Sequence, residues 1–255
     1  CKQHILPVLK EVDIAVTQGF IGHTAEGFTT TLGREGSDYT AGILAYCCEA
    51  ESVTIWKDVP GMLNADPKYF EQTQLLSQIS FKEAIELSYY GASVIHPKTV
   101  QPLQQKNIAL YVRSFIDPEA PGTIISANAD RDHHIPSYIV KFRQVLVTFS
   151  TKDFSFIAEK QLAEIFAALA SMKANINLMQ NSALNFSVLI DHHQMDVDNA
   201  KALLGAKYHI RYNENLELVT IRHYNDAILA EMSANKTCLV LQKTRTTARL
   251  VLQTH

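Results

Sequence analysis

The residues best suited to bind a ligand are residues 33–38, which read Gly-Arg-Glu-Gly-Ser-Asp soon after three consecutive threonines. The two glycines allow the backbone to approach a ligand closely. A helix is predicted to begin at Ser37 or Asp38, since both residue types are common N-caps. N–H groups at a helix start, nearby hydroxyls and the guanidinium of Arg34 suit an anion such as a carboxylate or a phosphate. An ordinary capped glycine turn is the alternative interpretation, but Arg34, Ser37 and Asp38 together favour a binding site.

A second polar segment, residues 57–68, follows a strand predicted at residues 52–56. Asp58 therefore lies at the carboxyl end of a strand, where open α/β sheets bind their ligands. The pairs Pro60-Gly61 and Asp66-Pro67 also fit ordinary turns. By itself this segment leaves a ligand site and a pair of turns as equal alternatives.

The first half of the chain alternates strands and helices up to about residue 125, which predicts a mainly parallel sheet covered by helices. A capping box at Ser80 predicts a helix that ends at Gly91. Pro97 suits the first turn of another helix, and residues 108–115 are typical of a strand. Residues 117–137 are rich in proline and polar residues, and this composition indicates a linker.

The second half follows a β-α-β-β-α-β order, which predicts a ferredoxin-like sandwich. The strands are predicted at residues 144–150, 176–180, 185–190 and 217–222, and the helices at 159–173 and 196–207. The remaining residues, 226–255, are too few for a second complete copy of this unit.

Four strings carry a resemblance to a known family: T-Q-G-F-I-G (17–22), T-T-T-L-G-R-E-G-S-D-Y-T-A (29–41), I-W-K-D-V-P-G-M-L-N-A-D-P-K (55–68) and Y-G-A-S-V-I-H-P-K-T (90–99). The chain resembles the aspartate kinase branch of the amino acid kinase family, with C-terminal ACT domains. The resemblance implies an α/β fold: residues 1–127 as the C-terminal part of a three-layer α/β/α kinase domain, 128–137 as a linker, and 138–255 as an ACT region. One full ACT module is expected at about 144–215, and a shortened second module at 216–255 together with strand 138–143.

The resemblance also implies a reaction. It is phosphoryl transfer from MgATP to the side-chain carboxylate of L-aspartate, giving 4-phospho-L-aspartate, the first step of lysine, threonine and methionine biosynthesis. The expected protein is a cytoplasmic homodimer, joined through its ACT domains and regulated by an amino acid, with lysine the commoner effector and threonine the alternative. Because the family's N-terminal Lys-Phe-Gly-Gly segment is absent from this sequence, the chain alone is expected to be an inactive fragment. The alternative is a non-catalytic, amino-acid-sensing and dimerising subunit.

Site residues carried over by motif fall into three groups. Phe20, Arg34 and Ser37 would hold aspartate, with Arg34 pairing a carboxylate, and Asp38 would orient the catalytic lysines. The nucleotide site would comprise Lys57, Asp58, Leu63, Lys68 and Ser93. The effector site, placed by the likeness to ACT modules, would comprise Phe154, Leu162, Asn177, Gln180, Asn181 and Ser182, although the polar residues among them fit an ordinary solvated loop equally well.

Three positions depart from the family. Lys57 stands where the family usually has threonine, Leu63 where it has tyrosine, and Ser93 where it has lysine. Loss of a cation near the phosphates should weaken ATP binding or slow transfer unless Lys57 or Lys98 substitutes for it.

Charge and composition exclude several classes of protein. A formal net charge of −3 provides no electrostatic footprint for nucleic acid or an anionic membrane, and no apolar run reaches the roughly 18 residues of a membrane-spanning helix. The four cysteines form no CxxC pair, and the histidine pairs lack metal-ligand spacing. No metal site on protein side chains is expected, and Mg²⁺ would be held by phosphate oxygens and water.

Overall fold

The computed structural model describes residues 3, 5–92 and 94–254, which form two compact units. Unit 1 contains residues up to 139 together with residues 221–224, and unit 2 contains residues 140–220 and those from 225 onwards. Residues 128–137, expected to be a linker, are hydrogen-bonded within unit 1. Asp132 Oδ1 accepts from Ser80 N, and Pro136 O accepts from Asn64 Nδ2.

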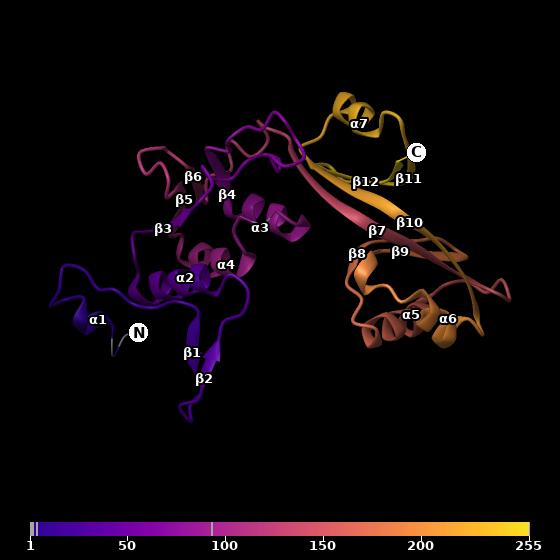
Figure 1. Ribbon diagram of the computed structural model, residues 1–255, viewed down its shortest axis with the longest axis horizontal. Helices are drawn as coiled ribbons and strands as arrows, with labels where there is room; N and C mark the ends of the chain where they lie inside the picture. Colours follow the sequence, from indigo (N-terminus) through magenta and orange to yellow (C-terminus); the bar gives the residue numbers. More distant parts are fainter. Residues whose placement is uncertain (1–2, 4, 93, 255) are drawn as a thin grey trace. The chain divides into compact units, whose positions relative to one another are not determined.

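Unit 1 is built on a four-stranded sheet in the order β3 (Ser52–Lys57), β5 (Ala109–Ser114), β6 (Thr123–Ser126) and β4 (Gln78–Ser80) (Figure 1). The β3–β5 and β4–β6 pairs are parallel, as predicted, but β5 and β6 are antiparallel. The reason is the short connection between them, since antiparallel neighbours need only a tight turn. That turn ends at Gly122, where φ is +69° and a Cβ would lie 2.2 Å from Val112 O.

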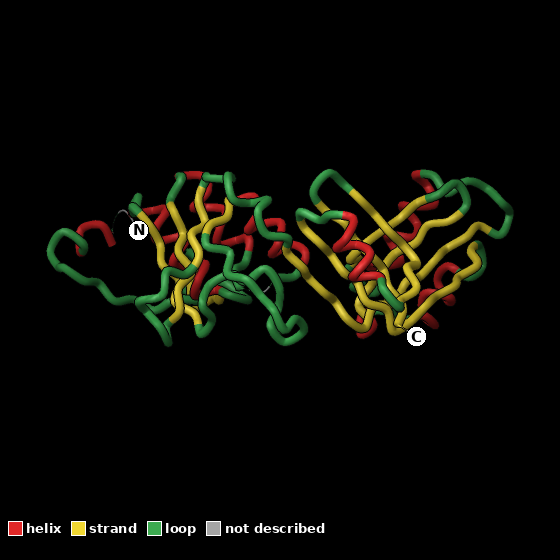
Figure 2. Tube along the Cα trace, turned by 90° about the horizontal axis from the view of Figure 1, so that it is seen from above, coloured by secondary structure: helices red, strands yellow, loops and turns green. Residues whose placement is uncertain are grey.

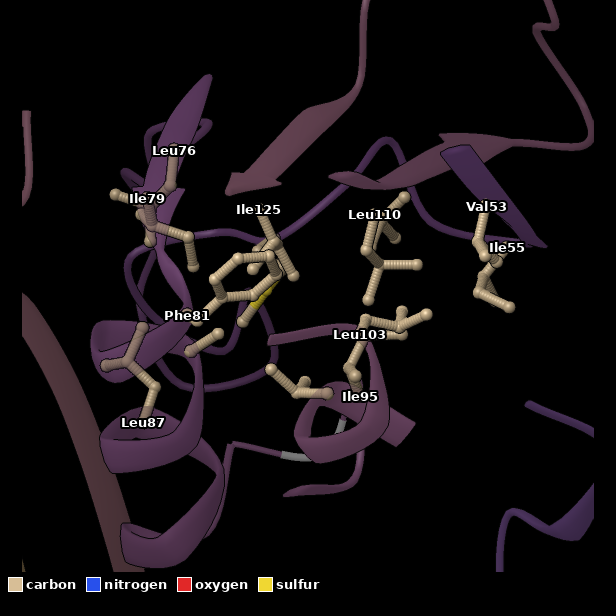
Figure 3. Packing of buried hydrophobic residues seen from close by; sticks show 14 of the residues in the cluster. Val53, Ile55, Leu76, Ile79, Phe81, Leu87, Ile95, Leu103, Leu110 and Ile125 are labelled. Carbon is tan, nitrogen blue, oxygen red and sulfur yellow. The ribbon is translucent and has the colours of Figure 1, made fainter. Parts of the chain in front are cut away.

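Three helices, α2 (Gly36–Cys48), α3 (Phe81–Tyr90) and α4 (Pro97–Lys106), cover one face of this sheet (Figure 1). Their apolar side chains meet those of the strands in one core, and Figure 3 shows Phe81, Leu87 and Leu103 together with Leu110 and Ile125. On the opposite face of β3 the side chains are exposed. The described residues therefore form two of the three layers that the resemblance implied.

Local signals set three of the helix boundaries as predicted. Ser80 caps α3 by accepting a hydrogen bond from Glu83 N, and Gly91 ends the helix with a φ of +123°. Pro97 occupies the first turn of α4. The cap predicted for α2 is wrong, because Glu35, rather than Ser37 or Asp38, is the N-cap residue and adopts a left-handed conformation without a side-chain cap.

Outside this core, unit 1 contains a short helix α1 (Ile5–Val8) and an antiparallel hairpin of β1 (Ile21–His23) and β2 (Thr29–Thr31). Figure 1 shows the hairpin projecting from the region of α2, away from the main sheet. No helix among the described residues is long and apolar enough to cross a membrane.

Unit 2 carries one six-stranded sheet in the order β11-β12-β10-β7-β9-β8. The predicted β-α-β-β-α-β order is present, and strands β10-β7-β9-β8 have the neighbour order of a ferredoxin-like sandwich. The elements are β7 (Ser137–Thr151), α5 (Glu159–Ser171), β8 (Ile176–Asn181), β9 (Asn185–Asp191), the 3₁₀ turn η1 (His192–Gln194), α6 (Val197–Leu204), β10 (Tyr208–Arg222), α7 (Asp226–Ser233), β11 (Lys236–Lys243) and β12 (Thr247–Thr254). β7 and β10 are longer than predicted, at 15 residues each.

Both faces of this sheet are apolar over part of their area. Val145, Val147 and Phe149 of β7 point to the core shared with α5 and α6, while Leu146 points to a second core. The second core contains side chains from both edge strands, Leu178 of β8 and Val240 of β11, so the sheet curves around it; the strands of unit 2 are drawn in yellow in Figure 2. Gln242 Nε2 of β11 donates to Met179 O of β8 at 2.7 Å.

Candidate functional site

The turn before α2 holds an unusual backbone. Gly33 and Glu35 both have positive φ, +79° and +56°, so two left-handed residues flank Arg34. Glu35 O accepts from Tyr39 N at 3.1 Å. Within the part of the chain that is described, the N–H groups of Ser37 and Asp38 have no hydrogen-bond acceptor, as is usual in the first turn of a helix. These donors are available to an anion.

Phe20 is fixed against this turn by contacts on both sides. Its N–H donates to Thr40 Oγ1 at 2.9 Å, and its carbonyl accepts from Leu32 N at 2.8 Å. A Cβ added to Gly36 would lie 2.7 Å from the ring carbon Cδ2 of Phe20. Gly36 therefore allows the aromatic ring to lie directly on the start of α2, and Phe20 is 42% exposed as a residue.

Arg34 offers a guanidinium group to solvent. Its side chain is 80% exposed, and its nearest charged partner is Glu35, with Nε 3.8 Å from Oε1. The other carboxylate oxygen of Glu35 is buried and has no hydrogen-bond partner among the described residues. Ser37, in the first turn of α2, is also exposed. Residues 34 and 37, which the sequence placed in an aspartate site, are thus accessible to a ligand.

Asp38 and Lys57 meet, although the sequence assigned them to different groups of site residues. Lys57 Nζ donates to Asp38 Oδ2 at 2.7 Å, and the two side chains are 25% and 14% exposed. Lys57 ends β3, and Asp38 lies in the first turn of α2. The pair therefore joins the glycine-rich turn to the carboxyl ends of the parallel strands β3 and β5.

The other predicted nucleotide-binding residues of this segment follow Lys57 along the chain, beyond the carboxyl end of β3. Asp58 is exposed in the turn directly after β3. Leu63 is half-buried and forms an isolated antiparallel bridge with Leu75. Lys68 is exposed, and its N–H donates to Asp66 Oδ1 at 2.9 Å. Ser93 lies outside the described residues.

Two of the residues predicted to bind an effector line a polar pocket in unit 2. Gln180 and Ser182 surround a space of about 270 Å³ with Arg211 and three further polar residues, Thr148, Asn185 and Ser187. Asn181 is exposed next to them. Arg211 was missed because the first half of β10 is polar and did not resemble a strand.

The other predicted effector residues lie elsewhere. Phe154 is 80% exposed in the loop after β7. Leu162 packs on the core beneath α5.

Asn177 has a structural position that the sequence did not reveal. It is the extra residue of a bulge in β8, where the pairing with β9 shifts between Ile176 and Leu178. Its amide nitrogen donates to Gln144 Oε1 at 2.8 Å and Asp191 Oδ1 at 3.1 Å, and its amide oxygen accepts from Lys141 at 2.9 Å. The side chain of Asn177 therefore cross-links neighbouring strands in this structure, and its contact with an effector stays a prediction.

Burial lowers the pKa of Lys141 in this network, with Arg249 acting in the same direction and Asp191 opposing it. Lys141 is half-buried. No cluster of three or more His, Cys, Asp or Glu side chains that could hold a metal ion is found among the described residues of either unit.

Comparison with known sequences places this geometry in context. Residues 2–114 match the Amino acid kinase family. Lysine-sensitive aspartokinase 3 of Escherichia coli K12 is 36% identical over 187 residues, which are 73% of this chain and 41% of that protein. Bifunctional aspartokinase/homoserine dehydrogenase 2 of Zea mays is 34% identical over 209 residues, 80% of this chain and 22% of that protein. The chain thus spans less than half the length of these relatives.

Solved structures give the same picture. E. coli aspartokinase III in complex with lysine and aspartate matches 98% of this chain and 59% of its own, with a TM-score of 0.79 and 28% identity. The same enzyme with aspartate and ADP matches with a TM-score of 0.77 and 27% identity. Clostridium acetobutylicum aspartate kinase has a TM-score of 0.86 at 22% identity over 98% of this chain and 62% of that one, a likeness of fold alone.

Proposed function

Because this chain belongs to the aspartate kinase family, we propose that it contributes to phosphoryl transfer from MgATP to the side-chain carboxylate of L-aspartate. The product is 4-phospho-L-aspartate, and the step opens lysine, threonine and methionine biosynthesis. The observation that carries the proposal is the Asp38–Lys57 pair, which unites an anion-binding turn with the carboxyl ends of β3 and β5. Ligands of α/β sheets bind at this edge.

The reaction needs positioning and charge rather than a covalent enzyme intermediate. A carboxylate oxygen of aspartate forms a bond to the γ-phosphorus while the bond from that phosphorus to the bridging oxygen breaks. The bridging oxygen keeps the electron pair and leaves with ADP, and no proton is transferred. In this proposal Arg34, Ser37 and Phe20 hold aspartate, and Asp38 orients a lysine. The nucleotide lies along Lys57, Asp58, Leu63, Lys68 and Ser93.

Mg²⁺ fits this site as a companion of the nucleotide. The described residues offer no cluster of three carboxylates or other ligands, and the carboxylate of Asp38 is already bound by Lys57. We therefore place the ion on phosphate oxygens and water, where it offsets phosphate charge. The side chains of this chain act on the carboxylate and the phosphates.

For unit 2 we propose an amino-acid-sensing ACT region that joins two copies of the protein. β8 is an edge strand of the sheet and meets β11 through a side-chain hydrogen bond, not through strand pairing, so its backbone can pair with a strand of a second copy. The E. coli relative is named lysine-sensitive, and its structure contains lysine. Lysine is therefore the first effector to test, and threonine is the alternative.

The direct test is hydroxylamine trapping of the aspartyl phosphate formed by the complete gene product from ATP and L-aspartate. We expect aspartyl hydroxamate to form at a rate that depends on both substrates and falls when lysine or threonine is added. A folded protein that binds lysine but forms no hydroxamate would instead favour a non-catalytic regulatory subunit, in line with the Leu63 and Ser93 departures.

Replacing Gln180 with alanine should weaken regulation because it removes one hydrogen-bonding group from the polar pocket of unit 2. The concentration of effector that halves activity should rise about fivefold, as expected for loss of a neutral hydrogen bond. The matched control is Gln194→Ala, since Gln194 lies outside this pocket and accepts a bond from Asn175 N. If the effector concentration that halves activity rose equally in both variants, Gln180 would not be a residue of the effector site.

A further inference from the structure

The Asp38–Lys57 pair has a geometry that assigns each residue a role. We propose that Lys57 is a catalytic residue that contacts the terminal phosphoryl group of the nucleotide, and that Asp38 is the positioning residue that holds its ammonium group. This inference rests on the proposed kinase function. The proposed function only places Lys57 in the nucleotide site, and this inference names the group of the nucleotide that Lys57 contacts.

The backbone of Lys57 is fixed at the edge where β3 and β5 end. In the parallel register Lys57 lies opposite Ser114. Its carbonyl accepts a hydrogen bond from Phe115 N at 2.6 Å, just beyond the end of β5. The side chain thus starts from hydrogen-bonded backbone at the carboxyl edge of the sheet and is held at its other end by Asp38.

The ammonium group of Lys57 has unused hydrogen-bonding capacity. A lysine ammonium has three donors, and the one acceptor of Lys57 Nζ found among the described residues is Asp38 Oδ2. The side chain is still 25% exposed, so two donors can reach a ligand. A phosphoryl group has the several strong acceptor oxygens that such a group can serve.

Asp38 is suited to positioning rather than to ligand contact. Its side chain is 14% exposed, less than that of Lys57. It lies in the first turn of α2, where the helix dipole favours a negative charge. An ionised Asp38 therefore keeps Lys57 aimed at the ligand edge when no phosphate is present. Ion pairs with this much solvent access contribute little to stability, so the pair can exchange part of its contact for a ligand at low cost.

Nucleotides of different phosphate number test the contact of Lys57. Isothermal titration calorimetry of the complete gene product with MgATP, MgADP and AMP should show that Lys57→Met weakens MgATP binding about 10- to 100-fold. MgADP should be affected less and AMP not at all. The control is Lys106→Met, because Lys106 pairs with Glu49 at 3.0 Å at the other end of α2, with 28% exposure.

Kinetics test the role of Asp38 separately. Asp38→Asn should lower kcat in the hydroxamate assay while the KM for ATP stays constant or falls, because Lys57 remains charged but is no longer aimed. Lys57→Arg should restore part of the ATP affinity lost in Lys57→Met. Equal weakening of ATP, ADP and AMP, or a wild-type-like affinity in Lys57→Met, would overturn this inference alone. A wild-type protein that neither binds MgATP nor forms hydroxamate would overturn both the proposed function and this inference.

Discussion

Replacing Glu83 with alanine is expected to destabilise unit 1 by about 3–5 kcal/mol, because it leaves a buried arginine without its carboxylate. Arg222 Nε donates to Glu83 Oε1 at 3.0 Å, and Arg222 Nη2 binds Oε2. The two side chains are 7% and 4% exposed. Urea unfolding followed by tryptophan fluorescence measures the free energy of unfolding of unit 1 directly, since Trp56 of β3 is the single tryptophan of this chain.

Glu86→Ala is the matched control for this prediction. Glu86 lies on the same helix and approaches the same arginine, with Oε2 3.5 Å from Arg222 Nη1, but its side chain is 33% exposed. Its removal should cost less than about 1 kcal/mol. If both variants lost the same stability, the buried Glu83–Arg222 pair would not be the interaction that holds residues 221–224 in unit 1.

The lowered pKa of Glu83 predicts that the stability of the protein depends on pH. Burial alone would raise the pKa of Glu83, but the nearby imidazole of His223, with Nε2 3.3 Å from Oε2, and the hydrogen bonds from Arg222 outweigh burial and lower the pKa below its ordinary value of 4.5. A group whose pKa is lower in the folded state stabilises the protein above its unfolded pKa, and this stability is lost as the pH falls through the folded pKa. Wild-type stability should thus decline below about pH 4.5, and Glu83→Gln should flatten that decline.

Helix α3 was predictable because its boundaries depend on neighbouring residues. Ser80 and Gly91 each satisfy backbone groups at one end of the helix. The start of α2 was not predictable in this way, since Ser37 and Asp38 are both residue types that commonly cap helices. Glu35 is the N-cap residue instead, because the chain adopts a left-handed conformation at Glu35 within the turn from Gly33 to Gly36.

The missed features depend on partners far along the chain. The first half of β10 contains polar residues such as His209 and Arg211, and it is a strand because it pairs with β7. Asp38 and Lys57 are 19 positions apart, and their contact follows from the packing of α2 beside β3. Asn177 was given an effector role because a bulge is not visible in the apolar pattern of a strand.

Replacing Arg34 with alanine is expected to lower kcat/KM for aspartate at least about 100-fold. In the proposed site Arg34 forms charge-assisted hydrogen bonds to a carboxylate of the substrate, each contributing about 1.5–3 kcal/mol. The structure leaves the guanidinium 80% exposed, with its nearest charged group 3.8 Å away, so little has to be broken when aspartate binds. The measurement is the hydroxamate assay across a range of aspartate concentrations at saturating MgATP.

Arg34→Lys should recover only a small part of the lost activity, because an ammonium group does not reproduce the planar fork that binds both carboxylate oxygens. Arg131→Ala provides the control, since Arg131 is exposed in unit 1 and donates to Ser77 Oγ. MgATP affinity should be unchanged in all three variants, which separates the aspartate site at Arg34 from the phosphate contact at Lys57. A normal KM for aspartate in Arg34→Ala would instead mean that the turn before α2 binds another anion, and a rise in the KM for ATP would identify that anion as the nucleotide.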